Sequence, residues 1–313
     1  MDVIQIQDAA IDEYMSTVLL TTMEDVNLLG VIIVNADSIA APAMQTTWKI
    51  LSYIGRKDIP VGLSSARGLN PFPWEYRSDC VKEGSIDVLK TIPDNPKWPP
   101  FPDGDKLLLD LLQQAKEPVT LLVTSPMTPL SNLLTAHPKL ASKIEQVVWM
   151  GGAIKVNGNL DPATVPNPPW NNCAEWNAFW DPMSVDWVFR NTSFPLTVFP
   201  LDMTNQAAIK TSFLTSLANQ SDDYKLSALA FQSYLLVSWE TFYDMWDVVT
   251  TCYLTRPDLF KPPTRMSLTI DTEFDDHQGC ISKARKGRQS DVIFNFSDDG
   301  TGFYDYVLEQ FKR

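Results

Sequence analysis

The segment VIQIQDAAIDEY (residues 3–14) joins a short apolar run to a group of acids. Val3 to Ile6 is typical of a buried strand, and Asp8, Asp12 and Glu13 follow it directly. Carboxylates this close repel one another, so water, the N–H groups of a helix start or a cation must compensate their charge. Ca²⁺ takes about six to eight oxygen ligands and would suit such a group. The alternative is an acidic helix start that binds no metal.

Short β-branched runs alternate with longer amphipathic stretches through residue 200. Strands buried on both faces read as continuous apolar runs, and helical crossovers make such strands parallel. The alternation therefore predicts an α/β fold with an open, mostly parallel sheet flanked by helices. Strands are predicted at residues 3–6, 28–34, 61–64, 119–124, 147–150 and 196–200, and helices at 12–23, 40–52, 106–114 and 130–136.

The C-terminal tail has a different pattern. Residues 265–271, 279–285 and 291–296 read as short strands separated by polar turns, and residues 304–313 read as a closing helix. Because neither an internal repeat nor a flexible linker is visible, we predict a single domain over residues 1–313. The tail then adds a small C-terminal strand region to it.

Two Pro-rich stretches, residues 92–105 and 159–172, are predicted to be loops because Pro has no N–H to give to a sheet. Loops this long are either functional or rigid surface connections. The second leads into AEWNAFWDP (residues 174–182). The Glu175 carboxylate and the Asn177 amide, two residues apart, could bind vicinal sugar hydroxyls. The alternative for this block is a helix N-cap followed by an apolar helix face.

Polar residues follow the predicted strand ends. Asp8, Asp37 and Thr128 each come just after a strand. Ligands of open parallel sheets bind at the carboxyl ends of the strands, so these residues are expected to share one site. Farther along, Asp247 interrupts an apolar helix, where a carboxylate needs a partner or a metal. Its neighbour Trp246 is either a core residue or a platform for a ligand.

Composition excludes several classes of protein. The net charge is −13 and the pI is near 4.6, which predicts no binding to nucleic acid. No apolar stretch approaches the roughly 18 residues of a membrane span, and no secretory signal is visible. The cysteines form no CxxC pair, so we expect free thiols and a cytoplasmic location. The cysteines are Cys80, Cys173, Cys252 and Cys280.

Histidine is scarce, which constrains the mechanism. The chain has two histidines, His137 and His277, and both lie in polar contexts that predict a surface position. Any mechanism built on a Ser-His or Cys-His pair would have to use one of them. We therefore expect that no histidine acts as the acid.

Several blocks together resemble the nucleoside hydrolases. They are QDAAIDEY (7–14), NAD (35–37), NPFPWEYR (70–77), VTSPMT (123–128), WMGGAIKVNGN (149–159), AEWNAFWDP (174–182) and MWD (245–247). The likeness extends over nearly the whole chain and is closest to the branch that prefers the purine nucleosides inosine, adenosine and guanosine. It implies an enzyme that uses Ca²⁺ and water to split the N-glycosidic bond of ribonucleosides into ribose and free base.

The resemblance also implies a role for each site residue. The Ca²⁺ ligands would be Asp8, Glu13, the backbone carbonyl of Thr128, and Asp247, with Asp8 also acting as general base. The ribose hydroxyls would be held by Asp12, Asn159, Glu175, Asn177 and Asp247. The base would lie against Asp37, Tyr76 and Trp246. Many pyrimidine-preferring relatives have histidine at the position of Trp246, so the resemblance implies stacking on a purine instead.

Some positions depart from the family pattern and keep an alternative open. Ile6 replaces an acid, Ala9 stands where relatives have Gly, Glu13 is longer than the usual Asp, and Pro129 replaces Asn. Small displacements at a site can greatly slow a reaction. The alternative is a ribonucleoside-binding or sensing protein with a weakly active or inactive site. In either case the resemblance implies a small-molecule ribonucleoside ligand and a homodimer or homotetramer.

Overall fold

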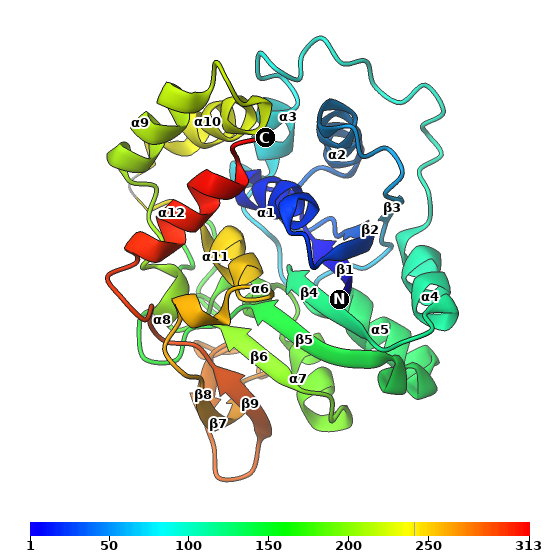
Figure 1. The fold of residues 1–313 in the computed structure, drawn as a ribbon. Helices are drawn as coiled ribbons and strands as arrows, with labels where there is room; N and C mark the ends of the chain where they lie inside the picture. The colour runs from blue at the N-terminus through cyan, green and yellow to red at the C-terminus, as the bar shows by residue number, and fades with distance from the viewer. Residues whose placement is uncertain (241) are drawn as a thin grey trace.

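The computed structural model describes residues 1–240 and 242–313, and nine strands within them form one sheet (Figure 1). The strands are β1 (Asp2–Gln7), β2 (Asn27–Ile33), β3 (Val61–Leu63), β4 (Val119–Thr124), β5 (Ile144–Met150), β6 (Leu196–Phe199), β7 (Thr264–Ile270), β8 (Ile281–Lys283) and β9 (Arg288–Val292). Their spatial order is β3-β2-β1-β4-β5-β6-β9-β7-β8. In this spatial order, the first seven strands, from β3 to β9, are parallel to their neighbours. Strand β7 is antiparallel to both β9 and β8.

This topology confirms the predicted open, mostly parallel sheet and its C-terminal strand region. The tail strands do not form a separate layer, because β9 pairs with β6 and extends the main sheet. One tail strand was predicted at residues 291–296 and lies instead at Arg288–Val292. The chain leaves the sheet after Val292 because Phe296 stacks between Phe260 and Phe303, away from the strands. The one-domain organisation stays a prediction.

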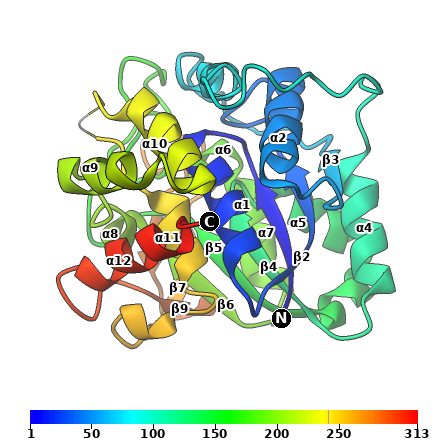
Figure 2. The same ribbon diagram turned by 45° about the horizontal axis from the view of Figure 1, so that its top comes forward.

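Helices cover both faces of the sheet, as Figures 1 and 2 show. The helices are α1 (Ile11–Thr22), α2 (Ala40–Ile54), α3 (Asp79–Glu83), α4 (Gly104–Gln114), α5 (Thr128–Ala136), α6 (Trp176–Trp180), α7 (Pro182–Asn191), α8 (Leu201–Thr204), α9 (Thr211–Gln220), α10 (Lys225–Val237), α11 (Trp246–Cys252) and α12 (Thr301–Gln310). One core joins α1, α2, α10, α11 and α12 to one face of the sheet. The other joins α4, α5 and α7 to the opposite face.

The alternation of side chains along each strand produces these two cores. In β1, Val3 packs toward α1 and α2, whereas Ile4 and Ile6 pack toward α4 and α5. Each of these three side chains is fully buried. Because both faces bury apolar residues, the strand reads as a short apolar run, and this is why its position could be predicted. The buried Gln5 interrupts the run and donates to the Ser16 hydroxyl at 3.0 Å.

Sequence reasoning missed α9 and α10. Helix α10 is apolar around most of its circumference, because it packs against α1, α3 and α9 together. A helix without a polar stripe gives no clear 3.6-residue period, so the pattern did not reveal it. Predicted helices with a clear stripe or cap were found to within a few residues. In α4, for example, the Asp103 carboxylate accepts a hydrogen bond from the Lys106 N–H.

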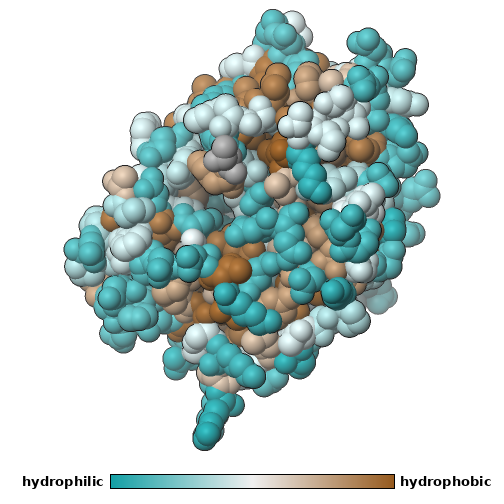
Figure 3. Space-filling view, turned by 90° about the vertical axis from the view of Figure 1, so that its left-hand side faces the viewer, coloured by the Kyte–Doolittle hydropathy of each residue, from teal (hydrophilic) through white to brown (hydrophobic). Residues whose placement is uncertain are grey.

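The surface agrees with the acidic, polar composition. Figure 3 shows a face covered mostly by hydrophilic side chains, with smaller apolar patches between them. Within the described residues, no helix combines the length and the apolar character needed to cross a membrane.

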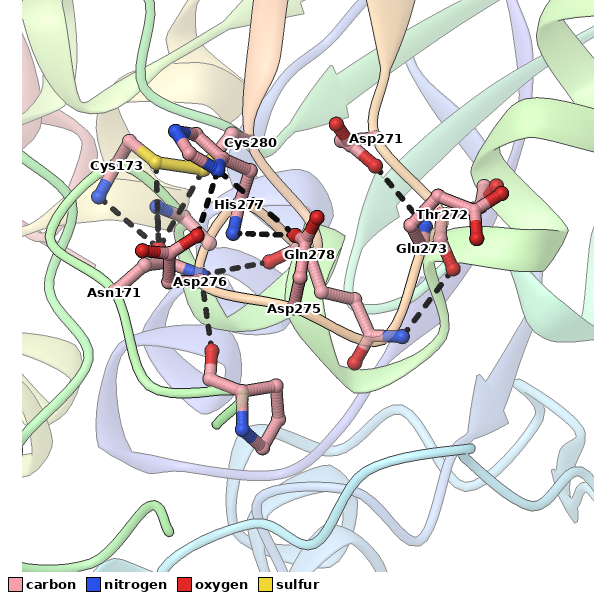
Figure 4. A network of polar contacts seen from close by, with 12 residues as sticks. Asn171, Cys173, Asp271, Thr272, Glu273, Asp275, Asp276, His277, Gln278 and Cys280 are labelled. Atoms are coloured by element: carbon pink, nitrogen blue, oxygen red, sulfur yellow. Dashed lines mark hydrogen bonds and ion pairs between the residues drawn. A yellow bond between two sulfur atoms is a disulfide. The ribbon is translucent and has the colours of Figure 1, made fainter. Parts of the chain in front are cut away.

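A disulfide joins Cys173 to Cys280, so the expectation of four free thiols is wrong for these two residues (Figure 4). Their Cα atoms lie 5.2 Å apart, because residue 174 forms an isolated antiparallel bridge with residue 280. Asn171 holds the loop there by donating to the carbonyl of Gln278 at 2.9 Å. Cys80 and Cys252 are free and buried, as expected. Disulfides persist in oxidising environments, so the argument from thiols for a reducing compartment loses its basis.

Loss of this disulfide should destabilise the protein. The bond spans 107 residues, so opening it frees a long loop in the unfolded chain and should lower the free energy of unfolding by about 2–5 kcal/mol. Thermal unfolding of Cys173→Ser/Cys280→Ser, compared with the parent protein with and without dithiothreitol, measures this. The double variant should be insensitive to the reductant. Four free thiols in the parent protein denatured without reductant would contradict the disulfide.

Candidate active site

A cavity of about 600 Å³ opens at the carboxyl ends of the central strands. Nine of the eleven predicted site residues line it, although they come from segments spread from residue 8 to residue 247. They are Asp8, Glu13, Asp37, Tyr76, Asn159, Glu175, Asn177, Trp246 and Asp247. Asp12 and Thr128 are not among the lining residues. The cavity is thus placed where ligands of open parallel sheets bind.

The turn after β1 gives the cavity its first acids. Ala9 has a φ of 68°, a left-handed conformation that costs an L-residue roughly 1–2 kcal/mol. The Gln7 side chain supports this turn by accepting the Ala9 N–H at 2.7 Å. The turn lets α1 begin at Ile11, so that Asp8 and Glu13 both reach the cavity. Glycine would adopt this φ without strain.

Three buried carboxyl groups meet in the cavity. The Glu13 carboxyl contacts those of both Asp8 and Asp247. Burial raises the pKa of Asp8 to about 7. Burial also holds the pKa of Glu13 well above its usual range, and the charges of Asp247 and Asp8 raise it further. Ionised, these groups would be strongly destabilised unless a positive charge lay among them.

The chemistry of these groups fits a hard divalent cation. All the donors are oxygen atoms, and Asp247 Oδ1 is buried without any hydrogen-bond partner. No Lys, Arg or His stands among the described lining residues to neutralise them. Among the described residues, the ligand atoms of the exposed group Asp275, Asp276 and His277 all lie within 4.8 Å of one another, whereas those of Asp8, Glu13 and Asp247 do not.

Thr128 follows β4 at the start of α5, as predicted, but its side chain faces another group. Its hydroxyl donates to Asp181 Oδ2 at 2.7 Å and contacts the Ser184 hydroxyl. Asp181 in turn caps α7, whose first residue is Pro182. The side chain therefore fixes α5 against α7. The ligand role expected for Thr128 involves its backbone carbonyl.

Asp12 lies behind the cavity and joins two helices. Its Oδ2 accepts the N–H groups of Asp247 at 2.6 Å and Val248 at 2.9 Å, which lie in the first turn of α11. Its Oδ1 accepts the Tyr234 hydroxyl at 2.6 Å. The side chain is fully buried. A carboxylate in α1 therefore sets the position of Asp247, which is more than two hundred residues away in the chain.

Backbone groups hold Glu175 and Asn177, the two residues expected to bind sugar hydroxyls. Glu175 caps α6, and its two oxygens accept the N–H groups of Asn177 and Gly152, each at 2.7 Å. Gly152 has a φ of 82°, and a Cβ there would lie 2.5 Å from Ile281 Cδ1, so any other residue would be strained at this position. Asn177 donates to the Met150 carbonyl at 3.2 Å. The helix-cap alternative is therefore correct for Glu175, yet the same side chain also lines the cavity.

The loop before α6 is fixed in place. Gly158 and Asn159 donate to the carbonyls of Asn172 and Ala174 at 2.7 and 3.1 Å, so the two ends of the Pro-rich loop run side by side. The Asn159 side chain accepts the Trp176 N–H at 3.2 Å. Together with the Cys173 disulfide, these contacts hold Asn159 at the cavity wall.

Aromatic residues form the other side of the cavity. Tyr76 packs edge-on against Phe242 at 6.2 Å, and Trp246 packs against Tyr243 at 4.7 Å between ring centroids. Arg77 holds the Tyr76 loop by donating to the Ser38 carbonyl at 2.9 Å and 2.8 Å. Trp246 is half-buried, so it is both a core residue and part of the cavity wall.

Sequence reasoning missed part of the lining. Seven missed residues are acidic or aromatic and lie in loops or short helices: Phe72, Asp79, Asp161, Glu240, Phe242, Tyr243 and Asp244. Phe72 could have been predicted, because it belongs to the block NPFPWEYR. The histidines are where they were expected, since His137 and His277 are exposed and neither lines the cavity.

Comparisons with known proteins point in one direction. The family model described as inosine-uridine preferring nucleoside hydrolase matches residues 3–304. A pyrimidine-specific ribonucleoside hydrolase, RihA of Shewanella woodyi, is 30% identical over 85% of this chain and 84% of its own length. The non-specific ribonucleoside hydrolase RihC of Escherichia coli is 31% identical over 64% of this chain and 62% of its own.

A solved structure agrees with them. The inosine-uridine preferring nucleoside hydrolase of Bacillus anthracis superimposes with a TM-score of 0.88, covers 99% of both chains and is 29% identical. This likeness confirms the fold over the full length of the chain. The chain therefore belongs to the inosine-uridine preferring nucleoside hydrolase family.

Proposed function

We propose that this protein hydrolyses the N-glycosidic bond of ribonucleosides with the help of Ca²⁺, and that it prefers purine nucleosides. The observation that carries the proposal is the meeting of Asp8, Glu13 and Asp247 in one cavity that Glu175 and Asn177 also line. The first group suits a cation and the second suits a sugar diol. Membership of the family supports the reaction.

The cation would be held by Asp8, Glu13, Asp247 and the Thr128 carbonyl. When bound there, Ca²⁺ orients water and lowers its pKa, and offers coordination positions to the sugar hydroxyls. Asp8 would accept the proton of the attacking water. Its Oδ2 is oriented by the Asp37 N–H at 3.3 Å, which leaves the remaining lone pairs for the reaction.

The remaining polar residues would bind the ribose. Asn159, Glu175, Asn177 and Asp247 line the cavity and offer oxygens to its hydroxyls. Positive charge develops on the sugar as the glycosidic bond breaks, and fixed carboxylates stabilise that charge without reorganising. Asp12, expected among the ribose ligands, would contribute through α11 by holding Asp247 in position.

The base would lie between the aromatic residues, with Asp37 beside it. Trp246 and Tyr76 line this part of the cavity and support stacking on a purine. RihA is described as pyrimidine-specific and RihC as non-specific, so the preference for purines is proposed from Trp246 and Tyr76 of this chain.

A nucleoside-binding or sensing protein is the second candidate. The observation in its favour is that the Ile6 side chain, at an otherwise acidic position, packs into the core and adds no ligand to the cavity.

Assembly as a homodimer or homotetramer is part of either proposal, and light scattering measures it. The disulfide is the observation that bears on the cellular compartment, and the proposed reaction is the same in any compartment.

Asp8→Ala should lower kcat on inosine by about 10²–10⁴-fold, because the variant removes the proton acceptor. Release of reducing sugar in the presence of Ca²⁺ measures the rate, and circular dichroism checks the fold. Asp87→Asn is the matched control, because Asp87 is exposed and pairs with Lys90 outside the cavity. A near-normal rate for Asp8→Ala would refute this role. Absence of sugar release by the parent protein at high concentration would leave the sensing alternative.

Trp246→Ala should slow the hydrolysis of purine nucleosides more than that of nitrophenyl riboside. Stacking assists the departure of a purine, whereas nitrophenolate leaves without assistance. The ratio of kcat/KM for the two substrates measures the difference. Trp239→Ala is the control, because Trp239 is 72% exposed and does not line the cavity. Equal losses on both substrates would count against the stacking role.

A further inference from the structure

The cavity holds more carboxyl groups than the proposed reaction needs. Nine carboxyl groups line it, and no basic side chain does so among the described residues. They are Asp8, Glu13, Asp37, Asp79, Asp161, Glu175, Glu240, Asp244 and Asp247. The roles proposed above use Asp8, Glu13, Glu175 and Asp247 for the cation and the sugar, and Asp37 for the base. The other four have no role in the hydrolysis of a neutral nucleoside.

The nearest basic groups do not balance this charge. Lys82 pairs with Asp79 at 2.6 Å. Arg77 donates its Nη2 hydrogens to Asn35 and Ser38, which lie at the base of its loop. With both of these and one divalent cation counted, carboxylates are still in excess. A concave site with this excess concentrates positively charged ligands and repels anions.

The unused carboxylates gather around the aromatic side of the cavity. Tyr76, Asp161 and Glu240 line the same cavity, and the charges of Asp161 and Glu240 add to the rise in the pKa of Tyr76 that burial causes. Asp244 lies in the segment between Phe242 and Trp246. Aromatic faces combined with carboxylates are the usual means by which proteins bind organic cations. The base-binding half of the cavity is therefore suited to a ring with positive charge.

We propose that this site acts on ribonucleosides whose base carries a positive charge on the ring, such as N-alkylated purines, in preference to neutral nucleosides, and that it excludes nucleoside phosphates. This inference rests on the proposed hydrolase function and names its substrate class. The cation binds between Tyr76 and Trp246, with Asp161 and Glu240 at the edge of the cavity. A phosphate group would meet the same carboxylates and be repelled.

The chemistry of such a substrate fits the groups present. The water oxygen forms a bond to C1′ of the ribose, and the bond from C1′ to the ring nitrogen breaks. Its electron pair goes to that nitrogen and neutralises the ring, so the base departs uncharged and needs no proton. The proton of the water passes to a carboxylate and then to solvent. The absence of a basic side chain from the described lining is no handicap for this leaving group.

The test compares 7-methylguanosine with guanosine in mildly acidic buffer, where the methylated ring is a cation. The variant Glu240→Gln/Asp161→Asn removes two charges at the cavity edge without touching the residues assigned to the reaction. Its kcat/KM for 7-methylguanosine should fall by about threefold to tenfold, whereas that for guanosine should stay within about twofold. Added salt should likewise slow only the cationic substrate. Asp87→Asn, outside the cavity, should change neither.

The outcomes separate this inference from the proposed function. Equal effects of the variant on both nucleosides, or hydrolysis of guanosine 5′-monophosphate as fast as of guanosine, would overturn the inference and leave the hydrolase in place. If neither nucleoside is hydrolysed, the proposed function fails. In that case the Kd of 7-methylguanosine and of guanosine is measured for the parent protein and for Glu240→Gln/Asp161→Asn. An unchanged Kd of 7-methylguanosine in the variant overturns the charge preference.

Discussion

Repulsion among buried carboxyl groups is the constraint on which the rest of the site depends. Asp8, Glu13 and Asp247 are brought into contact away from water, and Asp247 has an oxygen without any partner. Such an arrangement is unfavourable by itself, since each charge raises the pKa of its neighbours. A cation of oxygen-binding type would stabilise all three together. The same ion would then serve the reaction.

The fold brings these acids together by two different means. Parallel strands end at the same edge of the sheet, which places Asp8 and Asp37 side by side, as the hydrogen bond between them shows. Asp247 comes from the first turn of a helix far along the chain, and Asp12 fixes that turn by accepting two of its N–H groups. Asp8 thus lines the cavity itself, whereas Asp12 holds Asp247 in position from outside the lining.

Sequence reasoning could predict that residues after the parallel strands meet at one edge of the sheet. It could not predict that Asp12 fixes the first turn of α11. The apolar runs and the polar residues after them revealed the sheet and the placement of Asp8 and Asp37, because both follow from local pattern. The position of Asp12 behind the cavity depends on how α1 packs against α11, which no local pattern records. The same holds for Asp161, Glu240 and Asp244, which come from separate loops, and for the disulfide, whose two cysteines are brought together by the folding of a Pro-rich loop.

The most direct measurement of the central claim is calorimetric titration of Ca²⁺ into protein freed of metal by a chelator, together with its melting temperature. The account predicts one ion bound per chain, a higher Tm with Ca²⁺, and loss of both effects in Asp247→Asn. A protein that binds no Ca²⁺ and melts at the same temperature with and without it would contradict the account.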